Sequence, residues 1–283
     1  MSATTDFSAR LRSELHHRIR RMSGRDPTER GRTVTPLELL YDLTYVVAFA
    51  AASDQLAEQL ARGDVWRAIG AFVFAVWAVS WAWFNFTWFT SAYGTDDVVF
   101  RLATMVQMIG VIVLALGLPA MFASVDHGTS FDNGVMVAGY VVMRIALVAQ
   151  WLRAAVQDPS RRRVALTYAG FVAVAQIGWV TLAVAHVPFE TVVGVAAVLF
   201  VVEMGGPIVA EIRLGGTPWN ASHIAERYGL LTIIALGEVL FGTVTSVAAI
   251  VAKQGWSLEA VLIVVAGVGL TFGLWWSYFI VPS

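Results

Sequence analysis

Two acidic residues four positions apart, Glu38 and Asp42, stand at the start of a long apolar stretch. This spacing places both carboxylates on one face of a helix. Two carboxylates so close at low dielectric do not both stay ionised without help, so the pair should share a proton or hold a cation. We expect a proton or cation site here, with Arg227 as its counter-charge if the two helices that carry these residues are neighbours.

Three more charges, Arg144, Glu203 and Glu238, fall near the centres of apolar runs. A charge near the middle of a bilayer costs at least about 2.5 kcal/mol on insertion scales, so it should face other protein groups and have a partner. Arg144 is the only basic residue at that depth. We therefore expect at least one of the two acids to pair with Arg144.

A cluster of His223, Glu226 and Arg227 stands where another apolar run begins. His223 and Arg227 share a helix face, and Glu238 follows eleven residues after Arg227 on nearly the same face. A functional site and an ion-paired helix entrance both account for this cluster.

The sequence places Asp96, Asp97 and Arg101 together between two other runs. They form either the cytoplasmic mouth of a solute path or a capped helix start, since acids favour the first turn of a helix.

The residues and motifs that other kinds of chemistry need are absent from the sequence. The chain has no cysteine, which excludes disulfides, thiolate metal sites and cysteine nucleophiles. It also has no metal-binding histidine spacing, nucleophile elbow, P-loop or dinucleotide fingerprint. We expect no catalytic residue, no metal site, no cofactor and no enzyme activity. A membrane enzyme that uses Glu38 and Asp42 with Asp96 and Asp97 is the alternative left open.

The composition predicts the environment of these residues. Hydrophobic residues make up 58% of the 283 residues and charged residues 14%, where about 25% charged is usual. A water-soluble core of this size cannot bury so much apolar surface. The chain is therefore predicted to be an integral membrane protein, and its net charge of −1 argues against a nucleic-acid partner.

Eight runs approach or exceed the length of about 20 residues that a helix needs to cross a bilayer. They lack the alternation of membrane β-strands. We expect an all-α, polytopic transmembrane helix bundle of about eight spans, forming a single domain over residues 34–283. The expected spans are 36–60, 68–89, 102–125, 135–152, 164–187, 191–210, 230–251 and 260–281.

Basic residues predict the orientation. If the N-terminus is inside, fifteen arginines fall in inner segments and three basic residues in outer ones. Cytoplasmic loops carry such an excess. Both termini are thus expected in the cytoplasm, with the protein in a bacterial inner membrane.

The basic segment 1–33 has no apolar core of the kind that a signal peptide needs. Its apolar residues recur at helical spacing among arginines, which predicts an amphipathic interfacial helix held by anionic lipid. A disordered basic tail is the alternative. The apolar residues are Phe7, Leu11, Leu15, Ile19 and Met22.

Two further patterns have both a packing and a functional interpretation. Trp77, Trp81 and Trp88 share one helix face. They either pack against neighbouring helices or form an aromatic wall for a bound ligand. The run 205–207, Gly-Gly-Pro, predicts either a helix break beside a polar cavity or a closely packed kink.

Four stretches in chain order carry a resemblance to the bacterial low temperature requirement A (LtrA) family. They are TVTPLELLYDL at 33–43, the Trp-rich stretch 81–101, HIAERYGL at 223–230 leading to LGE at 236–238, and LWWSYF at 274–279. The resemblance implies a polytopic bacterial membrane protein associated by name with growth in the cold. Ile280 stands where the resemblance leads us to expect an acid, and the family tends to run further.

We therefore expect a transporter or channel for a small solute or ion, with intramembrane carboxylates as proton or cation sites. A non-transporting membrane sensor or assembly protein is the alternative. The oligomeric state is open. The expected path residues are Glu38, Asp42, Arg144, Glu203, Glu226, Arg227 and Glu238, with Asp96, Asp97 and Arg101 at the cytoplasmic mouth.

Overall fold

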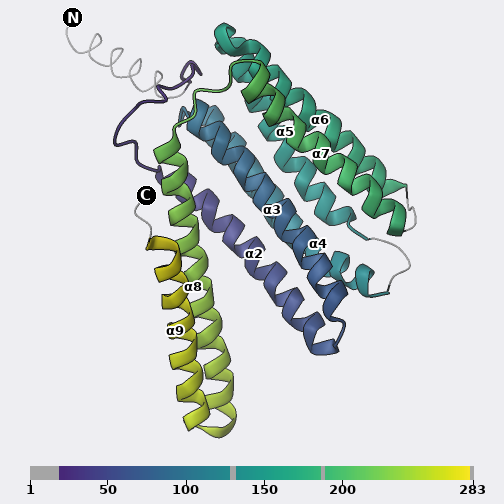
Figure 1. Cartoon of the computed structure of the whole chain (residues 1–283), viewed down its shortest axis with the longest axis vertical. Helices are drawn as coiled ribbons and strands as arrows, with labels where there is room; N and C mark the ends of the chain where they lie inside the picture. The colour runs from purple at the N-terminus through teal and green to yellow at the C-terminus, as the bar shows by residue number, and fades with distance from the viewer. Residues whose placement is uncertain (1–18, 128–131, 186–188, 281–283) are drawn as a thin grey trace, which may run out of the picture. The chain divides into compact units, whose positions relative to one another are not determined.

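The computed structural model describes residues 19–127, 132–185 and 189–280, and these residues form helices without any β-strand (Figure 1). The elements are α2 (Pro36–Arg62), α3 (Val65–Tyr93), α4 (Val98–His127), α5 (Gly134–Gln157), the short 3₁₀ helix η1 (Pro159–Arg161), α6 (Arg162–Val184), α7 (Phe189–Arg213), α8 (Ala221–Gln254) and α9 (Leu258–Phe279).

Each expected span lies in its own helix, apart from the ends of two spans: Ala185 and Ile280 follow the last residues of α6 and α9, and residues 186–187 and 281 lie outside the described residues. Seven of these helices, α3 to α9, are long and apolar enough to cross a membrane. The eighth, α2, has 27 residues but is less apolar, because four acids and Arg62 fall within it. The protein is thus an all-helical multi-pass membrane protein, and a crossing by α2 stays a prediction.

The chain divides into two compact units. Unit 1 comprises residues 1–31 and 47–221, and unit 2 comprises residues 32–46 and 222–283. Helix α2 therefore contributes its first part to unit 2 and the rest to unit 1. The expected single domain 34–283 stays a prediction.

Consecutive helices α4 to α7 of unit 1 run up and down beside one another (Figure 1). Helices α4 and α5 approach at glycines: a Cβ on Gly139 would lie 2.3 Å from the Leu114 nitrogen, and one on Gly117 2.3 Å from the Met136 nitrogen. Small residues allow such backbone contact between membrane helices.

Residues 19–31, here called the N-terminal strap, cross one end of unit 1 without forming a helix. The backbone nitrogen of Arg20 donates to Asp97 at 2.8 Å, that of Met22 to the Gln157 side chain at 2.6 Å, and that of Arg25 to the Ala92 carbonyl at 3.0 Å. Segments 92–97 and 157–158 thus meet at the same end of unit 1.

The expected N-terminal amphipathic helix is not confirmed. Phe7, Leu11 and Leu15 lie outside the described residues. Ile19 and Met22 lie in the non-helical strap, where Met22 is fully buried. Ile19 and Met22 are therefore not part of a helix. The strap is instead held by the buried side chain of Met22 and by hydrogen bonds from its backbone nitrogens to unit 1.

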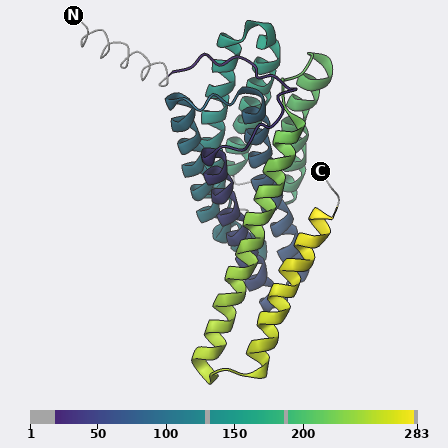
Figure 2. The ribbon, with the colours of Figure 1, turned by 90° about the vertical axis from the view of Figure 1, so that its left-hand side faces the viewer.

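Unit 2 contains the α8–α9 hairpin and the beginning of α2. Figure 2 shows α8 and α9 as a long hairpin. Ser257 caps the start of α9 by accepting a hydrogen bond from the Ala260 nitrogen at 3.2 Å. Thr35 caps α2: its hydroxyl accepts from the Glu38 nitrogen at 3.3 Å, and its nitrogen donates to the Glu38 carboxylate at 2.9 Å. This reciprocal capping box fixes the Glu38 carboxylate at the helix entrance.

Helix α7 continues through residues 205–207 instead of breaking there. A Cβ on Gly206 would lie 2.7 Å from the Phe171 Cβ, so this position packs closely against α6. Of the two interpretations of the Gly-Gly-Pro run, close packing against a neighbouring helix agrees with these observations.

Candidate functional site

Four ionisable side chains meet inside unit 2. Glu38 and Asp42 come from one face of α2, and His223 and Arg227 from one face of α8. All four are buried, with at most 3% of each residue exposed. The i, i+4 spacing places each pair on one face of its helix, and ion pairs join the two faces. Arg227 lies beside the two carboxylates as their counter-charge.

Arg227 lies against both carboxylates. Its guanidinium forms a hydrogen-bonded salt bridge with Asp42, in which Nε also lies 3.4 Å from Asp42 Oδ2. Its Nη1 is 3.9 Å from Glu38 Oε1, and His223 Nε2 is 3.3 Å from the same oxygen. Glu38 is therefore shared between a permanent cation and a histidine that is charged only when protonated.

The second buried cluster lies in unit 1, where Arg144 Nη2 is 3.5 Å from Glu203 Oε2. The hydroxyl of Tyr140 accepts a hydrogen bond from Arg144 and donates to Glu203 at 2.9 Å. Gln176 Nε2 donates to the other oxygen of Glu203 at 3.0 Å. Glu203 is thus the acid that pairs with Arg144, within a network drawn from α5, α6 and α7.

Asp97 is the buried member of the 96–101 cluster, and it caps α4 by accepting from the Phe100 nitrogen at 2.8 Å. Arg153 of α5 donates to Asp97 Oδ1 at 3.0 Å. Asp96 and Arg101 instead form an exposed pair at 2.9 Å. Of the two interpretations of Asp96, Asp97 and Arg101, a capped helix start agrees with these contacts.

The remaining acids of the expected path are not brought into either buried cluster. Glu226 and Glu238 are exposed on α8, and no ion pair within the described part of the chain involves them. Asp54 and Glu58 of α2 are also exposed, on the opposite side from Glu38 and Asp42. Their helical angles separate them from the buried pair.

Several polar residues of these sites were not predicted. Tyr140 stands one turn before Arg144, and Gln176 is a polar residue within an apolar run, so both carried a weak signal. Glu211 carried no such signal, because it lies near a helix end. It accepts from Tyr168 at 2.8 Å and from Thr217 Oγ1 at 2.8 Å.

These observations define a multi-pass helical membrane protein with two buried charge clusters. A family model described as Bacterial low temperature requirement A protein (LtrA) matches residues 33–283. The chain therefore belongs to the LtrA family.

A curated relative, an uncharacterized protein of Rhizobium meliloti (strain 1021), is 28% identical over 210 residues. The match covers 72% of this chain and 48% of the relative, so the chain spans about half the length of that relative. No solved structure matches the chain.

Proposed function

We propose that this LtrA protein is a transporter or channel for a small solute or ion, with the buried cluster of unit 2 as its proton or cation site. The observation that carries the proposal is the meeting of two buried carboxylates beside one guanidinium. Glu38 and Asp42 both lie against Arg227. Buried charges are costly unless they are balanced, so a second carboxylate beside the same guanidinium favours the binding of a proton or cation.

His223 lies against the same carboxylate: its Nε2 is 3.3 Å from Glu38 Oε1, and the residue is fully buried. A proton or a bound cation at this position would supply the positive charge that the second carboxylate favours. Binding and release of a proton or cation would couple to movement of a solute in this way.

The setting of the cluster supports the same proposal. Seven apolar helices supply the membrane frame. We place the protein in a bacterial inner membrane with both termini in the cytoplasm, because fifteen arginines fall in the inner segments of that orientation.

Flux through liposomes containing the purified protein tests this proposal. We expect proton or cation flux, alone or with a solute from a panel of small molecules, and we expect Glu38→Gln to reduce it at least tenfold. Asp42 stays in place to balance Arg227, so the variant should fold. Glu226→Gln is the matched control, because Glu226 is exposed on the same helix as His223.

A wild-type protein that is inactive under every imposed gradient would argue against transport. Full flux by a folded Glu38→Gln protein would remove the carboxylate from the mechanism. Replacing both acids by amides is a poorer test, because it strips Arg227 of both carboxylates and leaves a buried charge unbalanced.

One observation favours the alternative, a non-transporting sensor or assembly protein. The N-terminal strap joins residues 1–18 to the ends of α3 and α5 through Arg20, Met22 and Arg25. If residues 1–18 bind anionic lipid, the hydrogen bonds of the strap would transmit the effect of this binding to α3 and α5. Deleting residues 2–18 keeps the strap: a transporter should retain its flux, whereas a sensor should lose its output.

A further inference from the structure

An apolar groove of about 530 Å³ lies in unit 1 between α3, α4 and α7. Its lining includes Gly70 and Phe74 of α3, Met121 of α4, and Ala196 and Phe200 of α7. Small-molecule sites in proteins measure about 300–1,000 Å³ and are lined mainly by apolar side chains. The groove has the size and the lining of such a site.

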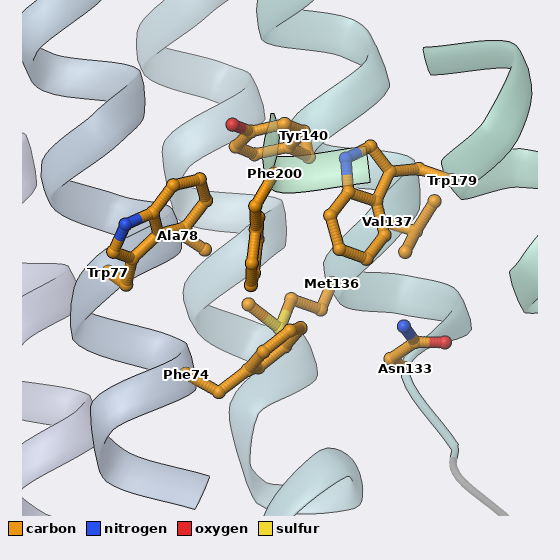
Figure 3. Close-up of a pocket in the computed structure, with 9 residues that line it drawn as sticks. All are labelled: Phe74, Trp77, Ala78, Asn133, Met136, Val137, Tyr140, Trp179 and Phe200. Carbon is orange, nitrogen blue, oxygen red and sulfur yellow. The ribbon is translucent and has the colours of Figure 1, made fainter. Parts of the chain in front are cut away.

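A smaller cavity of about 20 Å³ adjoins the groove, because Phe74 and Phe200 line both (Figure 3). Aromatic rings enclose it: the ring of Phe200 lies 3.7 Å from that of Trp77 and 5.2 Å from that of Trp179, between centroids. About 10–15 Å³ is enough for one water molecule, so the cavity has room for one small polar group.

Two hydrogen-bond donors in the lining of the small cavity have no acceptor. They are Asn133 Nδ2 and Trp179 Nε1, and neither finds a partner within the described residues. Asn133 is 3% exposed and Trp179 is 5% exposed. A buried N–H group without an acceptor is unfavourable, so an acceptor entering the cavity would be bound by these donors.

We propose that the groove and the small cavity together bind an elongated apolar molecule that ends in a hydrogen-bond acceptor such as a carbonyl. The apolar body occupies the groove, and the acceptor reaches the donor of Trp179 or Asn133. This site lies within unit 1 and does not depend on the proposed function.

The charges at the site support an uncharged end group. The small cavity has no ionisable lining residue except the tyrosine Tyr140, whose hydroxyl is committed to Glu203 and Arg144. The groove has a single charged lining residue, Arg67, which lies 3.3 Å from Asp64. A sugar, an amino acid or an inorganic ion would find too few polar partners there.

A carbonyl on an apolar chain has two sources, a free ketone or quinone and the ester of a membrane lipid. The experiment therefore uses the full chain in nanodiscs of ether-linked phospholipid, which has no ester carbonyl. The probe is 2-tetradecanone carrying a photoreactive diazirine, with unlabelled 2-tetradecanone and tetradecane as competitors. We expect labelling within 66–78 and 192–200, and competition by the ketone at least threefold stronger than by the alkane.

Gly70→Leu is the blocking variant. A Cβ on Gly70 meets nothing within 4 Å, and the larger leucine side chain at this lining position fills part of the groove. We expect labelling to fall at least tenfold. Gly170→Leu is the matched control, because Gly170 is also an open helical position of unit 1 and lines neither cavity.

Trp179→Phe keeps an aromatic ring and removes the donor. One hydrogen bond corresponds to about 3-fold to 10-fold in affinity, so we expect this loss for the ketone and no change for the alkane. Trp151→Phe is its control, since Trp151 Nε1 is also buried without an acceptor and lines neither cavity.

Labelling that persists in Gly70→Leu, or equal competition by ketone and alkane, overturns the proposal. An unchanged ketone affinity in Trp179→Phe and in Asn133→Leu overturns it as well. If ester-linked phospholipid lowers the labelling, a lipid supplies the carbonyl. If it does not, the site takes a free molecule, and either result supports the binding chemistry.

Discussion

Among single residues, the buried pair Arg144 and Glu203 of unit 1 lies in a hydrogen-bonded network. Glu203 has Arg144 at 3.5 Å, Tyr140 at 2.9 Å and Gln176 at 3.0 Å. The guanidinium carbon of Arg144 lies 4.5 Å from the centroid of the Tyr140 ring, which adds a cation–π contact. These contacts let both charges stay buried among the helices of unit 1.

Removing Arg144 should therefore destabilise the protein strongly. Arg144→Ala leaves Glu203 buried without its cation, and breaking such a pair typically costs about 3–5 kcal/mol. We expect little folded protein by size-exclusion chromatography in detergent. Adding Glu203→Gln should restore much of the yield.

Adding Glu238→Gln to Arg144→Ala is the matched control, because Glu238 is an exposed acid of α8. Equal rescue by the two glutamines would contradict the assignment of Glu203 as the partner.

The acid Asp97 predicts a pH dependence of stability. Burial alone would raise its pKa, but hydrogen bonds from Arg153 and from the nitrogens of Phe100 and Arg20 outweigh burial and lower the pKa below 3.8. A carboxyl group with a lowered pKa in the folded protein stabilises it above the unfolded pKa, and the effect is lost as the pH falls through the folded pKa.

We expect the Tm of Asp97→Asn to lie below that of the wild type at neutral pH. The difference should narrow as the pH falls below about 4. Asp96→Asn should behave like the wild type, because Asp96 is exposed and its φ of 51° is one that asparagine adopts readily. A constant Tm difference at all pH values would refute the role of the Asp97 charge.

Between helices, three glycines allow the backbones of α4 and α5 to approach each other closely. Gly110 and Gly117 of α4 face α5, and Gly139 of α5 faces α4. Close approach of the two backbones maximises van der Waals contact where the hydrophobic effect between helices is weak, as it is within lipid.

Gly139→Ala should separate these two helices. Its Cβ would lie 2.3 Å from the Leu114 nitrogen and 2.5 Å from the Gly110 oxygen, and backbone atoms cannot move aside as side chains do. We expect a loss of about 1–3 kcal/mol, seen as a lower Tm in detergent. Gly170→Ala should be neutral or stabilising, because its Cβ meets nothing within 4 Å. Equal Tm values for the two variants would contradict the close contact.

At the scale of the whole molecule, α2 decides the number of crossings. Its 27 residues extend about 40 Å, longer than the bilayer core of about 30 Å, although it is less apolar than the other seven helices. The arrangement with both termini in the cytoplasm requires α2 to cross.

Single cysteines test this crossing in a chain that has none of its own. We expect Asp64→Cys to react with a membrane-impermeant maleimide in intact cells, and Thr33→Cys to react only after permeabilisation. The cysteine-free protein is the control. Reaction of both positions from the same side would show that α2 does not cross.

The lengths of the apolar runs predicted the helical class and the approximate bounds of the eight helices α2 to α9, because run length is a local property. The amphipathic helix expected in residues 1–33 is not confirmed. The sequence also predicted which side chains share a face, including Glu38 with Asp42 and His223 with Arg227. Helical periodicity fixes such relations whatever the rest of the chain does.

Tertiary structure alone decided which faces meet. It selected Glu203 rather than Glu238 for Arg144, and it placed the acids of α2 against Arg227. The strap, the α4–α5 glycine contact and the cavity at Trp179 were also outside the reach of the sequence. Each depends on atoms far apart along the chain, and their proximity follows from how the helices pack rather than from any local pattern.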